Sequence, residues 1–383
     1  MGGNGRQRAA TDIPPLPPFA AYCRLVAVLT LLPGAVRAQA GPRTDTPRAG
    51  TFRVSFEPVI TTWDREFLID GYKQRIGASL PTTVFVHEER RATPLGVDFG
   101  ITNRISVGVR LPLVRVNTRE GYPRDSTGAP VDSAAVRWLD SLLADTTYAF
   151  DPLISTRKHL MYWSGDPEFE AKYRFVESRA FALSAALVMR LPWGHQDSPN
   201  NLFDLSSGDH QTDLEMQIAG ELTLFKKLWL NGLVRAGMQQ AGTRSRRVGP
   251  QDELLLPHAA LANLNWDPGD YARWDFAPML RLGGEYAFGF TVGYYRQAQD
   301  RYAYRTAQDS IDLAAHLGAP ISASVLNAGT EWRWTRLGVV MTYLGRDVEG
   351  SLSFEQTVSG GFGALVPVAS VFRIVMRTSR WPF

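Results

Sequence analysis

The sequence predicts an all-β fold, a single closed antiparallel transmembrane β-barrel of about 12 strands, within a range of about 10 to 14. Three observations lead to this prediction. Many segments of about ten residues alternate apolar and polar side chains with a period of two, which is typical of β-strands. The connections between these segments are alternately short and long, and a secretory signal precedes them all. Outer-membrane barrels combine these features, with short periplasmic turns and long external loops.

Residues 1–40 have the layout of a secretory signal peptide. Arg24 precedes the apolar run 25–32, and Pro33-Gly34 ends that run. Small residues then offer cleavage sites after Ala38 and after Ala40. The alternative, an anchor helix, needs about 20 apolar residues to cross a bilayer, and this run is far shorter. We therefore expect cleavage of the signal peptide and localisation in the outer membrane of a Gram-negative-type bacterium.

The charge and cysteine content of the remaining chain exclude several classes of function. The whole chain has 41 basic and 38 acidic residues, and the leader contains four of these bases and one of the acids. The mature chain is therefore neutral, which gives no reason to expect nucleic-acid binding. The single cysteine, Cys23, lies in the leader. The mature chain thus has no disulfide, no cysteine-ligated zinc or iron–sulfur site and no cysteine nucleophile.

The barrel is expected to cover residues 51–383, after a short N-terminal lead at 41–50. The first predicted strand is 51–61. The second is about 83–101, in which apolar residues at 95, 97, 99 and 101 alternate with small or polar ones. A tight turn at 102–104 then leads into the third strand, so these two strands form a hairpin.

The same hairpin unit recurs along the chain and gives nine arms, followed by a last strand that ends at Phe383. The arms begin near residues 105, 168, 181, 213, 228, 274, 288, 326 and 337. The final hairpin is predicted to turn at Thr335-Arg336, and residues 62–82 and 345–370 are left unassigned. The long connections are 117–165, 193–211, 240–272 and 305–322. A soluble sandwich would instead mix short and long connections through Greek-key crossings.

The long external loop 117–165 contains one predicted helix, at 132–144. Val136, Leu139 and Leu143 have helical spacing behind an Asp132/Ser133 cap. Two interpretations are open. The helix is either a lid or plug at the barrel mouth or a short helix on the surface of the loop, and the surface helix is the simpler interpretation.

Charged residues of both signs follow the polar faces of the predicted strands and are the candidate lumen lining. They either set the solute preference of a water-filled passage or pair across a narrow interior and close it. The candidates are Glu168, Glu170, Lys172, Arg174, Arg190, Glu215, Glu221, Arg235, Arg281, Glu285, Glu331, Arg333 and Arg373.

Aromatic residues near the short-turn ends predict an interfacial girdle that contacts outer-membrane lipid. The chain ends with Trp381-Pro382-Phe383, which resembles the C-terminal signal read by the outer-membrane barrel assembly machinery. Pro382 departs from that pattern because it cannot donate a ladder hydrogen bond. The girdle candidates are Phe175, Phe181, Phe225, Phe288, Trp332, Trp334, Trp381 and Phe383.

Four segments resemble a family of outer-membrane barrels named for the meta-pathway of phenol degradation. The hairpin 95–112 is similar to the opening hairpin of that family, and 165–175 is similar to its strand that ends in Lys-Tyr-Arg. Leu191-Pro192-Trp193-Gly194 and Gln211-Thr212-Asp213-Leu214 fit the next strand end and strand start, although Trp193 replaces the usual threonine. The resemblance implies transport of small, often hydrophobic compounds.

Catalytic motifs are absent from the sequence. No His-x-Ser strand motif, no His-Glu-x-x-His motif and no Gly-rich phosphate loop occurs. One loop is bracketed by residues whose types suit a metal or acid–base site, but a solvated loop explains them more simply. These residues are His195, Asp197, Asp209, His210 and Asp213.

The sequence therefore predicts a channel or transporter for small molecules, without enzymatic activity, cofactor or metal. The alternatives are a structural or surface-interaction barrel with a filled lumen and, less favoured, an outer-membrane hydrolase. The solute and the oligomeric state do not follow from the sequence.

Overall fold

The structure is a computed structural model that describes residues 44–383 with short gaps. The gaps are at 69, 79, 81–82, 152–158, 179, 209, 250–252, 254, 284, 346–347, 362–364, 379–380 and 383. The predicted signal peptide and Phe383 therefore lie outside the described residues.

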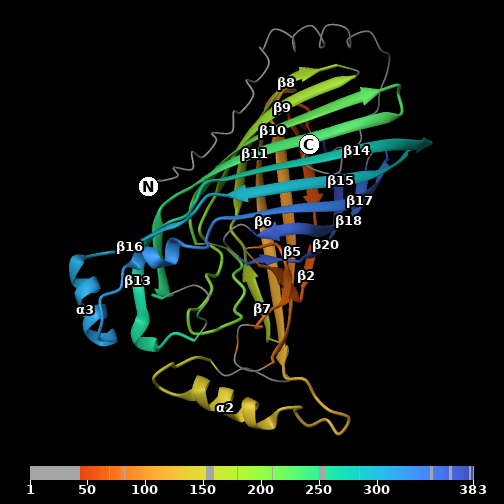
Figure 1. The fold of residues 1–383 in the computed structure, drawn as a ribbon. Helices are drawn as coiled ribbons and strands as arrows, with labels where there is room; N and C mark the ends of the chain where they lie inside the picture. The colour runs from red at the N-terminus through yellow and green to blue at the C-terminus, as the bar shows by residue number, and fades with distance from the viewer. Residues whose placement is uncertain are drawn as a thin grey trace, which may run out of the picture.

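Twelve antiparallel strand positions close into one barrel (Figure 1). Two positions are each built from two strands: β1 (Thr51–Phe56) with β2 (Val59–Trp63), and β7 (His159–Ser164) with β8 (Glu168–Glu177). β20 pairs with both β1 and β2, which closes the sheet on itself. The other positions are β5 (Phe85–Gly100), β6 (Ile105–Gly121), β9 (Phe181–Arg190), β10 (Asp213–Leu224), β11 (Leu228–Gln239), β14 (Tyr271–Gly283), β15 (Tyr286–Gln297), β17 (Trp332–Leu344), β18 (Val348–Gly361) and β20 (Ser370–Thr378).

The predicted fold class is confirmed, because the described chain forms a closed antiparallel barrel of the expected size. Closure suits a bilayer, because a closed sheet pairs its backbone groups internally and leaves no strand edge. Short turns join the strands at one end of the barrel, and long connections join them at the other. We call these the short-turn end and the long-loop end.

One predicted hairpin is wrong. β17 runs without a turn from Trp332 to Leu344, and its hairpin partner is β18, in a region left unassigned. The 3-10 helix η3 (Ala323–Asn327) occupies the start of the first predicted arm. The sequence pattern changes phase at Thr335 because Trp334 faces the barrel interior, whereas Leu337 faces outward. The phase change therefore marks a switch in the apolar face of one strand and not a turn.

The outer surface of the barrel is an apolar band. Side chains that face outward remain exposed on every wall of the barrel, such as Val109, Met216, Val234 and Phe290. A contiguous apolar surface of this extent suits lipid and not water. Aromatic side chains that face outward lie in contact at both margins of the band. Tyr286 lies beside Tyr343 near the short-turn end, and Trp274 stacks on Tyr294 towards the long-loop end.

The predicted aromatic girdle needs a correction at two positions. Trp332 and Trp334 lie at the long-loop end of β17 and not at the short-turn end. Trp334 is also buried, 6% exposed, and packs with Phe67 and Val366 inside the barrel. Their assignment followed from the wrong hairpin turn.

The long-loop end carries further structure beyond the barrel wall (Figure 1). β12, β13 and β16 form a three-stranded sheet that continues β11, β14 and β15, and α3 packs with it through Leu313. A smaller sheet continues the wall near β2 and β20. The bounds are β12 (Gly242–Arg247), η2 (His258–Ala260), β13 (Leu261–Asp267), β16 (Arg301–Tyr304), α3 (Ala307–Leu317), β3 (Arg65–Phe67), β4 (Lys73–Arg75), β19 (Val366–Pro367) and β21 (Trp381–Pro382).

The helix α2 (Ser133–Ala144) lies within the predicted helical segment, at the far end of the molecule from the C-terminus (Figure 1). Asp132 is its N-cap and accepts a hydrogen bond from the Ala135 amide. Leu139 and Leu143 are fully buried. Among the described residues, no helix is both long and apolar enough to cross a membrane.

Candidate functional site: the barrel lumen

Strand alternation decides which predicted residues face the lumen. Most of the candidates do face inward: Glu168, Glu170, Lys172, Arg174, Arg190, Glu215, Glu221, Arg235, Arg281 and Arg373. Three candidates do not. Glu285 is exposed in the turn between β14 and β15. Arg333 faces outward beside the inward Trp334, and Glu331 pairs with the outward Arg296 at the long-loop rim. The wrong hairpin turn explains both of these errors.

One wall of the lumen, on β6, β8, β9 and β10, is ion-paired. Arg110 and Lys172 both contact Glu170, each at 2.8 Å. Arg190 contacts Glu168 at 2.8 Å and Glu215 at 3.0 Å. Each cation therefore has a carboxylate, and Glu170 and Glu215 are almost fully buried among them. Buried charges persist when they are paired in this way. We call these residues the paired wall.

The other wall, on β11, β14, β17 and β20, is rich in arginine. Arg235 and Arg273 are direct cross-strand partners, and both contact Asp275, at 3.8 Å and 2.8 Å. Arg336 and Arg373 face the lumen on β17 and β20; β15 lies between β14 and β17, and β18 lies between β17 and β20. Arg273 and Arg336 were not among the candidates, because Arg273 fell just before a predicted strand and Arg336 fell in the predicted turn. We call these four residues the arginine wall.

An aromatic stack holds part of the arginine wall. The rings of Tyr295 and Trp334 lie 5.5 Å apart and are nearly parallel, with an interplanar angle of 8°. Tyr271 stacks on the other side of Tyr295 at 5.6 Å. The Arg336 guanidinium lies 4.1 Å from the Trp334 ring, which is a cation–π contact. The stack also reaches the paired wall, because the Tyr271 hydroxyl hydrogen-bonds Glu215.

The N-terminal segment 44–48 enters the lumen at the short-turn end. The Thr44 amide and hydroxyl donate to the Glu221 carboxylate at 3.0 Å and 2.6 Å. Asp45 pairs with Arg53 at 2.8 Å, and the Thr46 hydroxyl donates to the Asn103 carbonyl. Thr44 is fully buried. A predicted lumen acid, Glu221, therefore serves to hold the chain's own N-terminal segment.

Loops from several strands cover the long-loop end. An apolar cluster joins α2 to the segment before β5 and to the loop between β9 and β10. We call this cluster the lid. It is connected to the barrel interior, because the inward Thr118 and Arg90 donate to the carbonyls of Phe203 and Ser207. The lid consists of Ile76, Leu80, Val84, Val86, Tyr122, Leu139, Leu143, Phe150 and Phe203.

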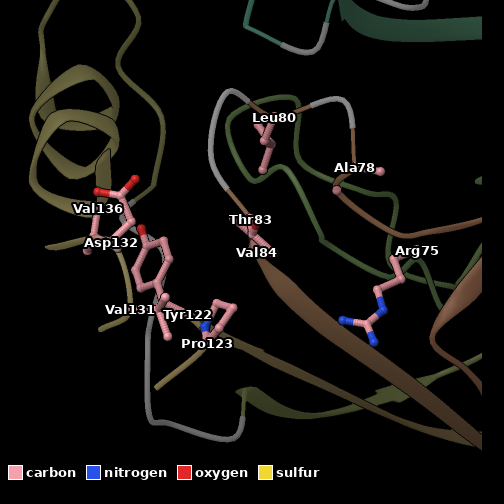
Figure 2. A pocket seen from close by; sticks show the side chains of 11 residues that line it. Arg75, Ala78, Leu80, Thr83, Val84, Tyr122, Pro123, Val131, Asp132 and Val136 are labelled. Carbon is pink, nitrogen blue, oxygen red and sulfur yellow. The ribbon is translucent and has the colours of Figure 1, made fainter. Parts of the chain in front are cut away.

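A cavity of about 440 Å³ opens beneath the lid beside the N-terminus of α2. Figure 2 shows Arg75 on one side and Tyr122 with Pro123 on the other, and Leu80 lies above them in the view. The predicted helix thus packs through Leu139 and Leu143 on side chains from the neighbouring long connections.

The residues proposed for a metal or acid–base site are held apart. His195 contacts Asp204 at 3.2 Å, whereas Asp197 pairs with Arg244 and Arg246 of β12. Asp213 faces the lumen 3.6 Å from Arg190, and Asp209 lies outside the described residues. Within the described ranges, no group of three or more candidate ligands is arranged to hold a metal ion.

A solved structure of an outer-membrane channel shares this fold. An outer membrane channel from Pseudomonas putida F1 matches with a TM-score of 0.56 over 89% of this chain and 99% of that chain, at 10% sequence identity. The CymD monoaromatic hydrocarbon channel matches over 86% of this chain and 88% of that chain, with a TM-score of 0.37 and 10% identity. No family model matches the sequence, and no curated protein does. The chain therefore has the fold of outer-membrane β-barrels.

Proposed function

We propose that this protein is an outer-membrane channel that passes small molecules without catalysis. The observation that supports the proposal most directly is the contrast between the two faces of one closed barrel. The outer face is an exposed apolar band, and the inner face carries charged residues of both signs. A charged inner face suits contact with water and polar solutes, which is how channels of this class set their preference.

In the proposed channel, both ends are covered by parts of the same chain. The segment 44–48 lies at the short-turn end, and the lid lies at the long-loop end. Passage would require both covers to move, so the resting protein should conduct weakly. The rival function is a structural barrel with a filled lumen. The same covering contacts and the ion pairs of the paired wall would support it by closing the interior.

Planar-bilayer conductance of protein refolded from residues 41–383 tests the proposal. The variant Asp45→Asn/Glu221→Gln weakens both charged contacts of the segment 44–48. A hydrogen bond to a charged group contributes about 1.5 to 3 kcal/mol, so the open population should rise about tenfold or more. Glu285→Gln is the control, because this acid is exposed in a turn at the same end of the barrel.

Heat-modifiable gel mobility provides the check that each protein is folded. Conductance steps that become more frequent in the double variant, and not in the control, support a channel. If the double variant and the control are both folded and neither gives conductance steps, the proposal is overturned and the filled barrel is favoured.

A further inference from the structure

The two walls of the lumen differ in charge balance. On the paired wall, each of Arg110, Lys172 and Arg190 has a carboxylate within 3.0 Å. A cation neutralised at such close range attracts a passing ion only weakly. The paired wall is therefore expected to contribute little to solute preference.

Two carboxylates on β14 and β18, Asp275 and Glu355, lie among the four guanidinium groups of the arginine wall. Two more carboxylates lie nearby, but each already has its own cation: Glu57 pairs with Arg377, and Glu215 pairs with Arg190. Asp275 is already shared between Arg235 and Arg273. In the part of the chain that the structure describes, Arg336 and Arg373 have no carboxylate within 4.0 Å. Arg336 lies close enough to Arg273 and Arg373 to be repelled by both, and Glu355 and Asp275 attract it from beyond 4.0 Å. The wall thus carries an excess of positive charge.

Neutral groups fix Arg336 in place. Its Nε donates to the Thr357 hydroxyl at 3.3 Å, and its guanidinium lies over the Trp334 ring. Contacts of this kind order a guanidinium without cancelling its charge, unlike an ion pair. The positive charge of Arg336 is therefore held at a fixed position on the lumen wall.

Small residues leave room beside these cations. Gly293 on β15 and Gly338 on β17 both face the lumen between Asp275 and Glu355. A Cβ atom at Gly293 would lie 3.0 Å from Asp275 Oδ1, and one at Gly338 would lie 2.7 Å from Glu355 Cγ. The glycines thus let the two carboxylates lie flat against the wall, so larger side chains do not screen the arginines from the lumen.

We infer that the arginine wall is an anion-selective site, at which Arg336 and Arg373 bind small organic carboxylates during passage. This inference rests on the proposed channel function and adds the class of solute. It also modifies the expectation drawn from the family resemblance, since a lumen with fixed excess charge suits polar anions better than hydrophobic compounds.

The reversal potential in a potassium chloride gradient tests the selectivity. The wild-type channel should prefer chloride, and Arg336→Gln/Arg373→Gln should lower the chloride-to-potassium permeability ratio by about threefold or more. The matched control is Arg296→Gln/Arg333→Gln, which removes two positive charges from the outward face of β15 and β17. The control should keep the wild-type ratio. A conducting wild type without anion preference, or equal losses in both variants, overturns the inference and leaves the channel function intact.

A binding measurement separates the site from conduction. Isothermal titration of folded protein in detergent with succinate should detect one site that Arg336→Gln/Arg373→Gln weakens about tenfold or more, since two charge-assisted contacts are lost. Succinamide, a neutral analogue of succinate, should not bind. Succinate binding without conductance would support the site and overturn the channel. Equal binding of succinate and succinamide, or none by the wild type, would overturn the anion site.

Discussion

Arg190 illustrates how a single residue organises the paired wall. Its guanidinium contacts Glu168 and Glu215, and it donates to the Tyr271 hydroxyl at 2.6 Å. Glu215 is 1% exposed, so without Arg190 its buried charge would lose the cation that contacts it at 3.0 Å. Removing Arg190 alone is therefore expected to cost more than the pair contributes, because it leaves a buried charge without its partner.

Asp197 connects the loop between β9 and β10 to β12, and its charge makes this connection depend on pH. Burial alone would raise the pKa of the Asp197 carboxyl, but the Arg246 and Arg244 guanidinium groups lower it below its usual value. A carboxyl with a lowered pKa stabilises the folded loop above its unfolded pKa of about 4. This stability is lost as the pH falls through the lower folded value.

We predict that Asp197→Asn weakens the loop by about 1 to 2 kcal/mol at pH 7 and that the difference from wild type shrinks below about pH 4. Hydrogen exchange of the loop amides, measured across this pH range, provides the readout. A difference that is the same at pH 7 and at pH 3 would contradict the role of the charge. Asp267→Asn is the control, because the ion pair of Asp267 with Arg301 is 4.0 Å long and exposed.

The inward side chains of the arginine wall show where sequence reasoning succeeds for residues and where it fails. Arg235 and Arg373 lie in strands with strict alternation, so their face follows from the period of two. Arg336 was missed because its strand carries apolar residues on the inner face near one end and on the outer face elsewhere. A local pattern cannot separate such a switch from a turn, since both change the phase of the alternation.

Among the elements, Arg247 at the end of β12 holds the lid together. Its Nη1 donates to the carbonyls of Tyr148 and Leu256, both at 2.6 Å, and its Nη2 donates to Asn200 at 2.9 Å. The guanidinium also lies 3.7 Å from the Phe150 ring. One side chain therefore connects the segment after α2, the β9–β10 loop and the segment before η2.

We predict that Arg247→Met loosens the lid but not the barrel. The substitution leaves buried carbonyl groups without a donor, which costs about 1 to 3 kcal/mol for each group. Limited proteolysis should cut the segment after α2 faster, while heat-modifiable mobility of the barrel stays unchanged. Arg301→Gln is the matched control on the same three-stranded sheet, since Arg301 is 82% exposed. Loss of barrel mobility in Arg247→Met, or no change in cleavage, would contradict a lid-specific role.

The barrel strands were easier to predict than the structure outside them. β10 and β11 lie within a residue or two of their predicted limits because lipid on one side and lumen on the other impose alternation over their full length. β12 and β13 were placed in the predicted loop 240–272, and β16 was not separated from the predicted arm that begins near residue 288. Each of these strands is short and packs in a cluster with α3 and η3 that no local sequence pattern indicates. The lid also depends on contacts between segments that are distant in sequence, and α2 is the part of it that a local sequence pattern predicted.

At the scale of the whole molecule, the two covered ends lie in series with the arginine wall between them. In the proposed channel, a solute that enters from the long-loop end would meet the lid first, then the charged lumen, and finally the segment 44–48. The cavity beneath the lid is lined by Arg75 and by apolar residues such as Leu80 and Val136. The order of these features depends on which end faces the cell exterior.

The long-loop end of the barrel is predicted to face the cell exterior, as the long loops of outer-membrane barrels do. Residues 41–383 contain no cysteine, so a single thiol introduced there reports on one position alone. Ser126 is exposed in the connection before α2, and Lys226 is exposed in the turn between β10 and β11. In intact cells, a membrane-impermeant maleimide should label Ser126→Cys and leave Lys226→Cys about tenfold less labelled, because a charged reagent crosses the bilayer very slowly. Permeabilising the outer membrane should make the two signals equal. Labelling of Lys226→Cys alone in intact cells would reverse the orientation, and with it the order in which a solute meets the lid and the N-terminal segment.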